Sequence, residues 1–227
     1  MVNNKNFIKN IKISLVFNII IAVLTLLAAI FMFTGFKFMD EEPLLESTKL
    51  GIFKFFTVDS NLFMAIVAII FAIKEISVLR GKSHSIGKNY YILKLMGTSA
   101  VALTFLVVFC YLGFIVEGGV IRLLKNNNLF LHLIIPLLSI FTFIFFEKNN
   151  KITIKNTLWG ALPAVIYSIF YTINVLTHIE NGSVSIQYDF YAFVQGGLWQ
   201  IAIVIPLMYL FSYIISLTLW TFNRKKK

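Results

Sequence analysis

Six stretches of this chain are long and apolar enough to cross a membrane as helices, and this feature limits the fold more than any other. Each has about 20 residues, the length that an α-helix needs to span about 30 Å of hydrocarbon. None alternates apolar and polar residues as the strand of a membrane barrel does. We therefore expect an all-α integral membrane bundle of six transmembrane helices, forming a single domain over residues 1–227. The expected spans are 13–34, 55–73, 95–116, 129–146, 158–178 and 198–221.

Composition agrees with this class of protein. Hydrophobic residues make up 59% of the chain and charged residues 13%, against about 45–50% and 25% in soluble domains. A lipid bilayer is therefore the expected surrounding. The abundance of Lys, Asn, Ile and Phe is typical of an AT-rich bacterial genome, which favours the plasma membrane of a bacterium. The sequence gives no oligomeric state.

The basic residues predict the orientation of the bundle. Of the 20 Lys and Arg, 15 fall in the amino-terminal tail, the second loop, the fourth loop and the carboxy-terminal tail, which all lie on the same predicted side. The positive-inside rule therefore predicts that both termini are cytoplasmic. The formal net charge of +10 does not indicate nucleic acid as a partner, because topology and attraction to anionic lipid explain cations at helix ends.

Polar residues interrupt the apolar run at the outer end of the second span. Thr57, Ser60 and Asn61 follow helical spacing and share one face, whereas Asp59 points roughly the other way. A threonine bonded to its own helix and an asparagine that joins helices would explain two of these residues without function. Asp59 is harder to explain, because a carboxylate inside a membrane is costly unless it is paired or hydrated.

A second polar point lies at a similar depth in the fourth span. His132 enters from the same side, and Pro136 follows it by four residues. Proline has no N–H, so the carbonyl of His132 is expected to lose its usual helical partner. An interfacial or structural histidine is the alternative interpretation.

The fifth span carries a third polar face. Tyr167, Tyr171, Asn174 and His178 are spaced four, three and four residues apart, which places them on one side of a helix. This face is either an aromatic packing stripe or the wall of an outward-facing pocket with an apolar surround. Such a pocket suits a lipid-like substrate.

Two motifs resemble a known family. "FKFFTVDSN" at the head of the second span and "LHLIIP" at the head of the fourth are similar to those of the androgen-induced protein family of membrane hydrolases, which includes the androgen-dependent regulator of tissue factor pathway inhibitor and bacterial relatives. The resemblance implies a threonine hydrolase that cleaves fatty acid esters of hydroxy fatty acids. It implies Thr57 as the nucleophile and His132 as the second catalytic residue. Asp59, Ser60 and Asn61 depart from the animal pattern and resemble the bacterial branch.

The implied chemistry is reasonable for these residue types. A threonine hydroxyl needs a base to take its proton, and neutral histidine accepts and returns protons near pH 7. The expected site, near the outer leaflet, therefore has Thr57 and His132 as catalytic residues and requires no cofactor or metal. The residues expected to bind a lipid-like ester are Ser60, Asn61, Tyr167, Tyr171, Asn174 and His178.

Several alternatives remain open at this stage. The oxyanion donor is one of Ser60, Asn61, Tyr171 or Asn174. A lipid or small-molecule transporter or scramblase would also carry polar residues and proline-broken helices. A zinc-dependent hydrolase would need at least three ligands. A membrane protein without catalysis, acting through interactions, is the remaining alternative.

Overall fold

The computed structural model describes residues 4–39 and 47–224. Within these ranges the chain is helical except for loops and a small antiparallel hairpin of β1 (Ile179–Glu180) and β2 (Ser183–Val184). The long helices are α1 (Asn4–Thr34), α2 (Phe56–Leu79), α3 (Lys88–Val107), α6 (Ile135–Phe145), α7 (Leu162–Thr177) and α8 (Ile201–Asn223). The short helical segments are η1 (Lys49–Lys54), η2 (Val108–Leu112), α4 (Gly113–Ile115), α5 (Gly119–Leu123), η3 (Phe130–Ile134), η4 (Ile154–Ala161) and η5 (Leu198–Gln200).

Five helical stretches are long and apolar enough to cross a membrane, as in a multi-pass integral membrane protein. They are Lys5–Thr34, Phe56–Leu79, Lys88–Ile115, Ile154–Thr177 and Leu198–Asn223. The sixth expected span, 129–146, corresponds to η3 and α6, which form the shorter apolar helix Phe130–Phe145. The all-α class is confirmed, and a sixth crossing stays a prediction.

Three helices extend beyond the apolar runs from which they were predicted. Helix α1 begins at Asn4, α2 continues to Leu79 and α3 begins at Lys88, whereas the expected limits were residues 13, 73 and 95. Hydropathy marks the thickness of the hydrocarbon, while a helix continues into the interface because Lys, Glu and Arg are good helix formers. The basic residues near these ends therefore lie on helices and not in loops.

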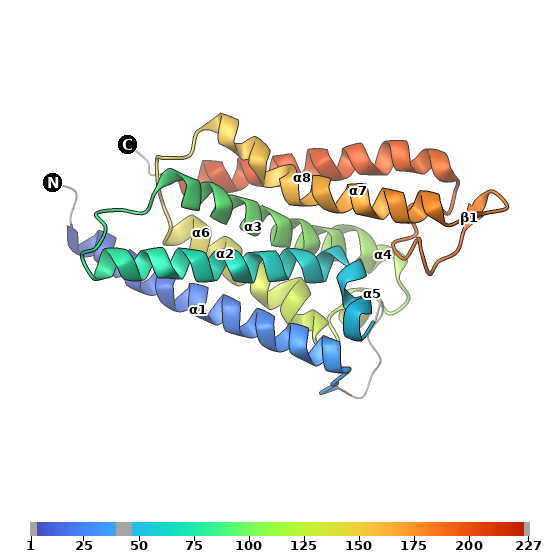
Figure 1. Cartoon of the computed structure of the whole chain (residues 1–227), viewed down its shortest axis with the longest axis horizontal. Helices are drawn as coiled ribbons and strands as arrows, with labels where there is room; N and C mark the ends of the chain where they lie inside the picture. Colours follow the sequence, from blue (N-terminus) through green and yellow to red (C-terminus); the bar gives the residue numbers. More distant parts are fainter. Residues whose placement is uncertain (1–3, 40–46, 225–227) are drawn as a thin grey trace.

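The helices form one bundle whose two ends differ (Figure 1). The start of α1 and the end of α8 lie at one end, which we call the termini end. The first turn of α2, the short helices α4 and α5 and the hairpin lie at the other, which we call the loop end. Large apolar side chains such as Phe170 and Phe211 are exposed on the outside, as expected for a surface in contact with lipid.

A buried charged cluster joins α1, α2, α3 and the turn that follows α6 at the termini end. Lys94 of α3 was expected in a cytoplasmic loop, and this was wrong: it is fully buried, with its Nζ 3.0 Å from Oε1 of Glu147. The amide of Asn18 donates to Glu75 and to Glu147 at 3.1 Å each, and Ser14 donates to Glu147 at 3.0 Å. Burial of a lysine is tolerated only with such partners, and these come from distant parts of the sequence.

Candidate active site

Helix α2 begins with an unusual cap. Phe55, the residue before the helix, is extended and its side chain makes no capping hydrogen bond. The N–H groups of a first helical turn have no partner within the helix. Here the hydroxyl oxygen of Tyr191 accepts the N–H of Phe56 at 2.9 Å, and the N–H of Thr57 is a second donor near this oxygen. The cap thus brings Tyr191 next to Thr57.

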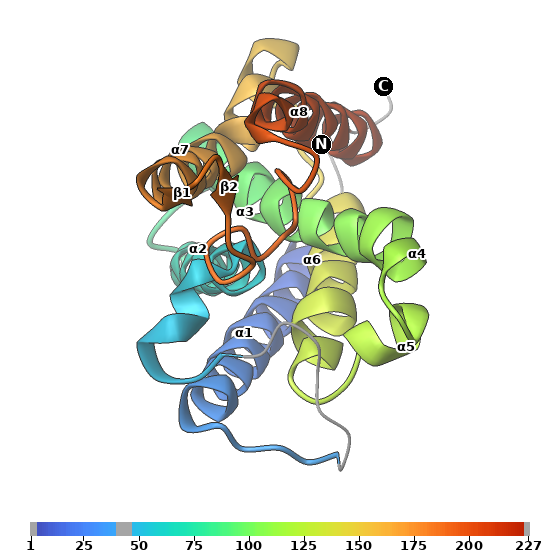
Figure 2. The ribbon, with the colours of Figure 1, turned by 90° about the vertical axis from the view of Figure 1, so that its right-hand side faces the viewer.

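The loop that follows β2 positions Tyr191. The carboxylate of Asp189, in this loop, is fully buried. It accepts hydrogen bonds from the N–H of Phe193 at 2.8 Å, the N–H of Val194 at 3.1 Å and the hydroxyl of Tyr171. Viewed from the loop end, this loop crosses in front of the ends of α2 and α3 (Figure 2). Asp189 therefore fixes the loop against α7 and holds Tyr191 over the start of α2.

Thr57 and His132 come together from α2 and η3. The Oγ1 of Thr57 lies 3.4 Å from Nε2 of His132, and Nδ1 of His132 lies 2.7 Å from the carbonyl oxygen of Leu123. A carbonyl only accepts, so Nδ1 carries the hydrogen of the neutral ring and the lone pair of Nε2 faces the threonine. The contact is long for a hydrogen bond, as is common for catalytic pairs without substrate. It is the arrangement of a nucleophile beside a base.

The backbone beneath His132 is a π-helical turn. The N–H of Ile135 bonds to the carbonyl of Phe130, five residues earlier. In this register the N–H that Pro136 lacks would have reached the carbonyl of Leu131. The sequence predicted that the carbonyl of His132 would be the one to lose its helical partner. Because of the π turn, the carbonyl without a helical partner is that of Leu131 instead of His132.

Asn61 fills this gap. Its Nδ2 donates to the carbonyl of Leu131 at 3.0 Å and to the carbonyl of Thr57 at 2.7 Å. Asn61 therefore connects the turn that carries Thr57 to the turn that carries His132. Its amide hydrogens are used in this way, and Asn61 is not among the residues that line the large groove described below.

Two small cavities meet at Thr57. One of about 20 Å³ is lined by Thr57, His132 and Tyr191 among others, and one of about 70 Å³ is lined by Thr57, Tyr191, Tyr167 and Tyr171 among others. The first has about the volume that one water needs. Phe56, Tyr167 and Tyr171 also line the groove on the other side of α2. These three side chains separate the groove from the hydroxyl of Thr57.

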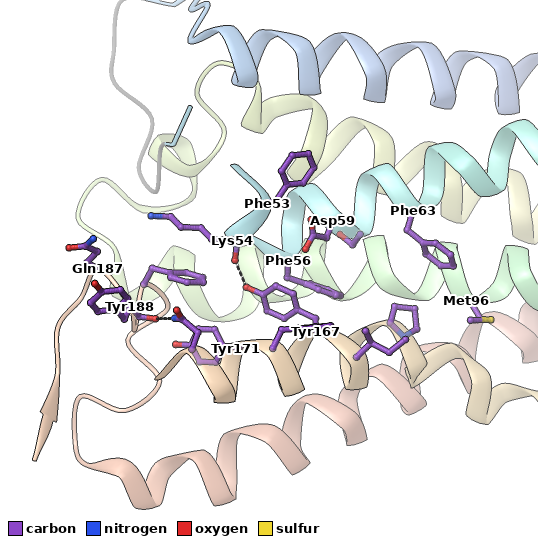
Figure 3. A pocket seen from close by; sticks show the side chains of 16 residues that line it. Phe53, Lys54, Phe56, Asp59, Phe63, Met96, Tyr167, Tyr171, Gln187 and Tyr188 are labelled. Carbon is purple, nitrogen blue, oxygen red and sulfur yellow. Dashed lines mark hydrogen bonds between the residues drawn. The ribbon is translucent and has the colours of Figure 1, made fainter. Parts of the chain in front are cut away.

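The groove is a cavity of about 770 Å³ between η1, α2, α7 and the loop before α8 (Figure 3). Its lining is mostly apolar. Four residues that the sequence predicted for substrate binding belong to it: Ser60, Tyr167, Tyr171 and Asn174.

The remaining polar contacts near the groove are structural. The ring of His178 is outside the groove lining, stacked on Tyr188 at 3.6 Å, and its Nδ1 donates to the carbonyl of Asn174 at 2.7 Å. The amide of Asn174 donates to the carbonyl of Tyr188 at 2.9 Å. Ser60 donates to the carbonyl of Thr57 at 3.1 Å and lies 3.0 Å from the hydroxyl of Thr104.

Two functional features were missed by the sequence reasoning. Tyr191 stands in the aromatic segment "YDFYAF", where no spacing links it to Thr57, and the carbonyl of Leu123 is a main-chain atom that any residue would supply.

Within residues 4–39 and 47–224, no three His, Cys, Asp or Glu side chains come close enough to hold a metal ion.

The fold and site thus define a helical membrane protein with a Thr–His pair beside an apolar groove. No family model, no curated protein and no solved structure matches the chain significantly.

Proposed function

We propose that this protein is a membrane-embedded ester hydrolase with Thr57 as nucleophile and His132 as general base. The observation that carries the proposal is the orientation of His132. Its Nδ1 is held by the carbonyl of Leu123, and its Nε2 faces Oγ1 of Thr57 at 3.4 Å. The position of this pair, with His132 buried and Thr57 half-buried next to an apolar groove, supports a substrate drawn from the lipid phase.

The reaction would proceed through an acyl-enzyme. Oγ1 of Thr57 attacks the ester carbonyl carbon while Nε2 of His132 takes the hydroxyl proton. The tetrahedral intermediate collapses, the C–O bond to the alcohol breaks, and His132 returns the proton to the leaving alkoxide. A water then attacks the acyl-threonine with His132 again as base, which releases the carboxylic acid and restores the threonine hydroxyl.

The oxyanion donor in this scheme is the hydroxyl of Tyr191. Its oxygen already accepts the N–H of Phe56, so its own hydrogen points either to the hydroxyl of Tyr167, with which it interacts, or into the cavity that it shares with Thr57, and the oxyanion would take this hydrogen from Tyr167. Burial raises the pKa of Tyr191 to about 12, and the group therefore stays protonated at neutral pH. Of the donors considered from the sequence, Asn61 is bonded to two carbonyls and Tyr171 to Asp189.

The substrate in this proposal is a lipid-like ester, with fatty acid esters of hydroxy fatty acids as the class that the motif resemblance implies. The charge asymmetry supports cytoplasmic termini and a site near the outer leaflet of a bacterial plasma membrane. The proposal includes no cofactor, no metal and no nucleic acid.

Labelling with a fluorophosphonate probe tests the nucleophile. The purified protein should be labelled and should hydrolyse p-nitrophenyl esters, and Thr57→Ala should abolish both while thermal stability stays near that of the wild type. Thr57→Ser should keep part of the activity. Thr142→Ala is the matched control, because Thr142 is a buried helix threonine whose hydroxyl bonds only to the carbonyl of Leu138. Hydrolysis that survives in Thr57→Ala would refute the assignment.

The pH dependence tests the base. A protonated imidazole cannot accept the threonine proton, so turnover should rise as the pH is raised and His132 becomes neutral. His132→Gln should lower turnover by about 100-fold or more and remove this rise. EDTA should leave the rate unchanged. Chelator inhibition that zinc reverses would favour a metal hydrolase.

A transporter is the second candidate, and the charged cluster at the termini end favours it. A separate cavity of about 220 Å³ is lined there by Glu75 and Glu147, and buried ionisable groups in membrane spans often mark a pathway for ions or protons. In proteoliposomes, a transport activity lost in Glu147→Gln but kept in Thr57→Ala would support this candidate. Absence of both activities would favour a membrane interaction protein.

A further inference from the structure

Asp59 belongs to the groove and not to the reacting cavities. It follows Thr57 by two residues on α2 and lines the 770 Å³ groove, while Thr57 lines the two small cavities. In the described part of the chain, no hydrogen bond or salt bridge involves its carboxylate. The protein thus carries an unpaired carboxylate in the first turn of a candidate membrane span, where a charge is costly unless it is paired or hydrated.

Aromatic side chains line the groove together with this carboxylate. Those of Phe53, Phe56 and Tyr167 are drawn near Asp59 in Figure 3. The faces of aromatic rings attract cations, and a set of rings with a carboxylate is the usual receptor for a substituted ammonium group. An anion would be repelled by Asp59, and a neutral group would leave its charge uncompensated.

The groove's own cation does not neutralise Asp59. The ammonium group of Lys54 lies over the rings of Phe55 and Phe190, 5.0 and 5.5 Å from their centroids. In Figure 3 it points toward the loop end, away from Asp59. No lysine or arginine among the described residues forms a salt bridge with Asp59, so its carboxylate is available to a cationic ligand.

We propose that the groove binds an ester lipid that carries an ammonium group, with that group held by Asp59 between Phe53, Phe56 and Tyr167. This inference rests on the proposed function and names its substrate class. The acyl chain occupies the apolar floor of the groove along Phe63 and Met96. The rings of Phe56 and Tyr167, whose centroids are 5.1 Å apart, line both the groove and the cavity at Thr57, and they must move apart for the ester to reach the threonine.

A matched pair of esters tests the proposal. Decanoylcholine carries a trimethylammonium group, and 3,3-dimethylbutyl decanoate has the same shape without the charge. The wild type should hydrolyse the choline ester with a kcat/KM about tenfold higher, as expected for one desolvated cation–aromatic and carboxylate contact. Asp59→Asn should remove this preference, because the carboxylate that binds the ammonium group is lost. Lys54→Gln is the control and should keep the preference.

Binding separates this inference from the proposed function. Calorimetry of decanoylcholine with Thr57→Ala, in a neutral maltoside detergent, should show binding that Asp59→Asn weakens about tenfold in the same background. If no ester is hydrolysed but this binding is present, the ammonium site stands and the hydrolase proposal fails. Equal kcat/KM for the two esters together with binding that does not depend on Asp59 would overturn the ammonium site, whatever the outcome at Thr57.

Discussion

Replacing Asn61 tests whether one side chain connects the two halves of the candidate site. In Asn61→Leu the carbonyl of Leu131 loses its donor and stays buried, since Pro136 has no N–H to offer. The carbonyl of Thr57 keeps the hydroxyl of Ser60 as a donor. One orphaned carbonyl costs about 1–3 kcal/mol, although Oδ1 of Asn61 has no hydrogen-bond partner and its removal offsets part of this loss. At about 2–4 °C per kcal/mol for a chain of this size, the melting temperature should fall by about 2–12 °C.

A second substitution, Pro136→Ala, tests the same hydrogen bond by giving the carbonyl of Leu131 a backbone N–H donor. Pro136→Ala supplies an N–H that, in the π register, points to the carbonyl of Leu131. It should therefore stabilise the Asn61→Leu variant by about 1–2 kcal/mol relative to its effect in the wild type, where Asn61 already occupies that carbonyl. Thermal unfolding of the four proteins of this cycle in detergent measures the coupling directly. If Pro136→Ala has the same effect in both backgrounds, Asn61 and the missing proline N–H do not share an acceptor, and the account of this turn is wrong.

Three further predictions concern other parts of the molecule. Tyr191→Phe should lower kcat by about 10²–10³-fold with little change in KM, because the oxyanion donor is lost. Tyr188→Phe, which changes a tyrosine away from Thr57, should leave kcat unchanged. Equal effects of the two substitutions would count against Tyr191 as the donor. Lys94→Met should lower the free energy of unfolding by about 3–5 kcal/mol, because two buried carboxylates lose their cation. Replacing the exposed Lys88 with Met should leave this free energy nearly unchanged. Similar small losses in both variants would mean that the cluster does not stabilise the protein. The topology can be tested with single cysteines in a background that replaces the exposed Cys110. Ser183→Cys should react with an impermeant maleimide in intact cells, and His84→Cys should react only after permeabilisation. The reverse pattern would mean that the proposed topology is inverted.

The sequence predicted the class of fold because long apolar runs have few other solutions in a membrane. It also paired Thr57 with His132 correctly in space, since their similar depth in two spans and the motif resemblance pointed to the same two residues. Whether they perform catalysis stays a prediction.

The rest depends on contacts between distant segments, which periodicity does not encode. The π turn at His132 is a change of hydrogen-bond register, and only the position of Asn61 on a neighbouring helix explains why the orphaned carbonyl is tolerated. Lys94 has the sequence context of a loop cation, and its burial depends on Glu147, which lies in the turn after α6, more than 50 residues later in the chain. Tyr191 reaches Thr57 because Asp189 folds its loop, a tertiary effect with no local signature.

The hydrogen bond from His132 to Leu123 has a consequence for how this site tolerates change. The acceptor is a main-chain oxygen nine residues before the histidine, so no single substitution at Leu123 can delete it. What can displace it is a change in the length of the segment between α5 and η3, because that would move the carbonyl away and release the ring to its other tautomer. The connection should therefore accept many different side chains but few insertions or deletions. A variant lengthened there by one residue would keep every side chain of the site and lose the base.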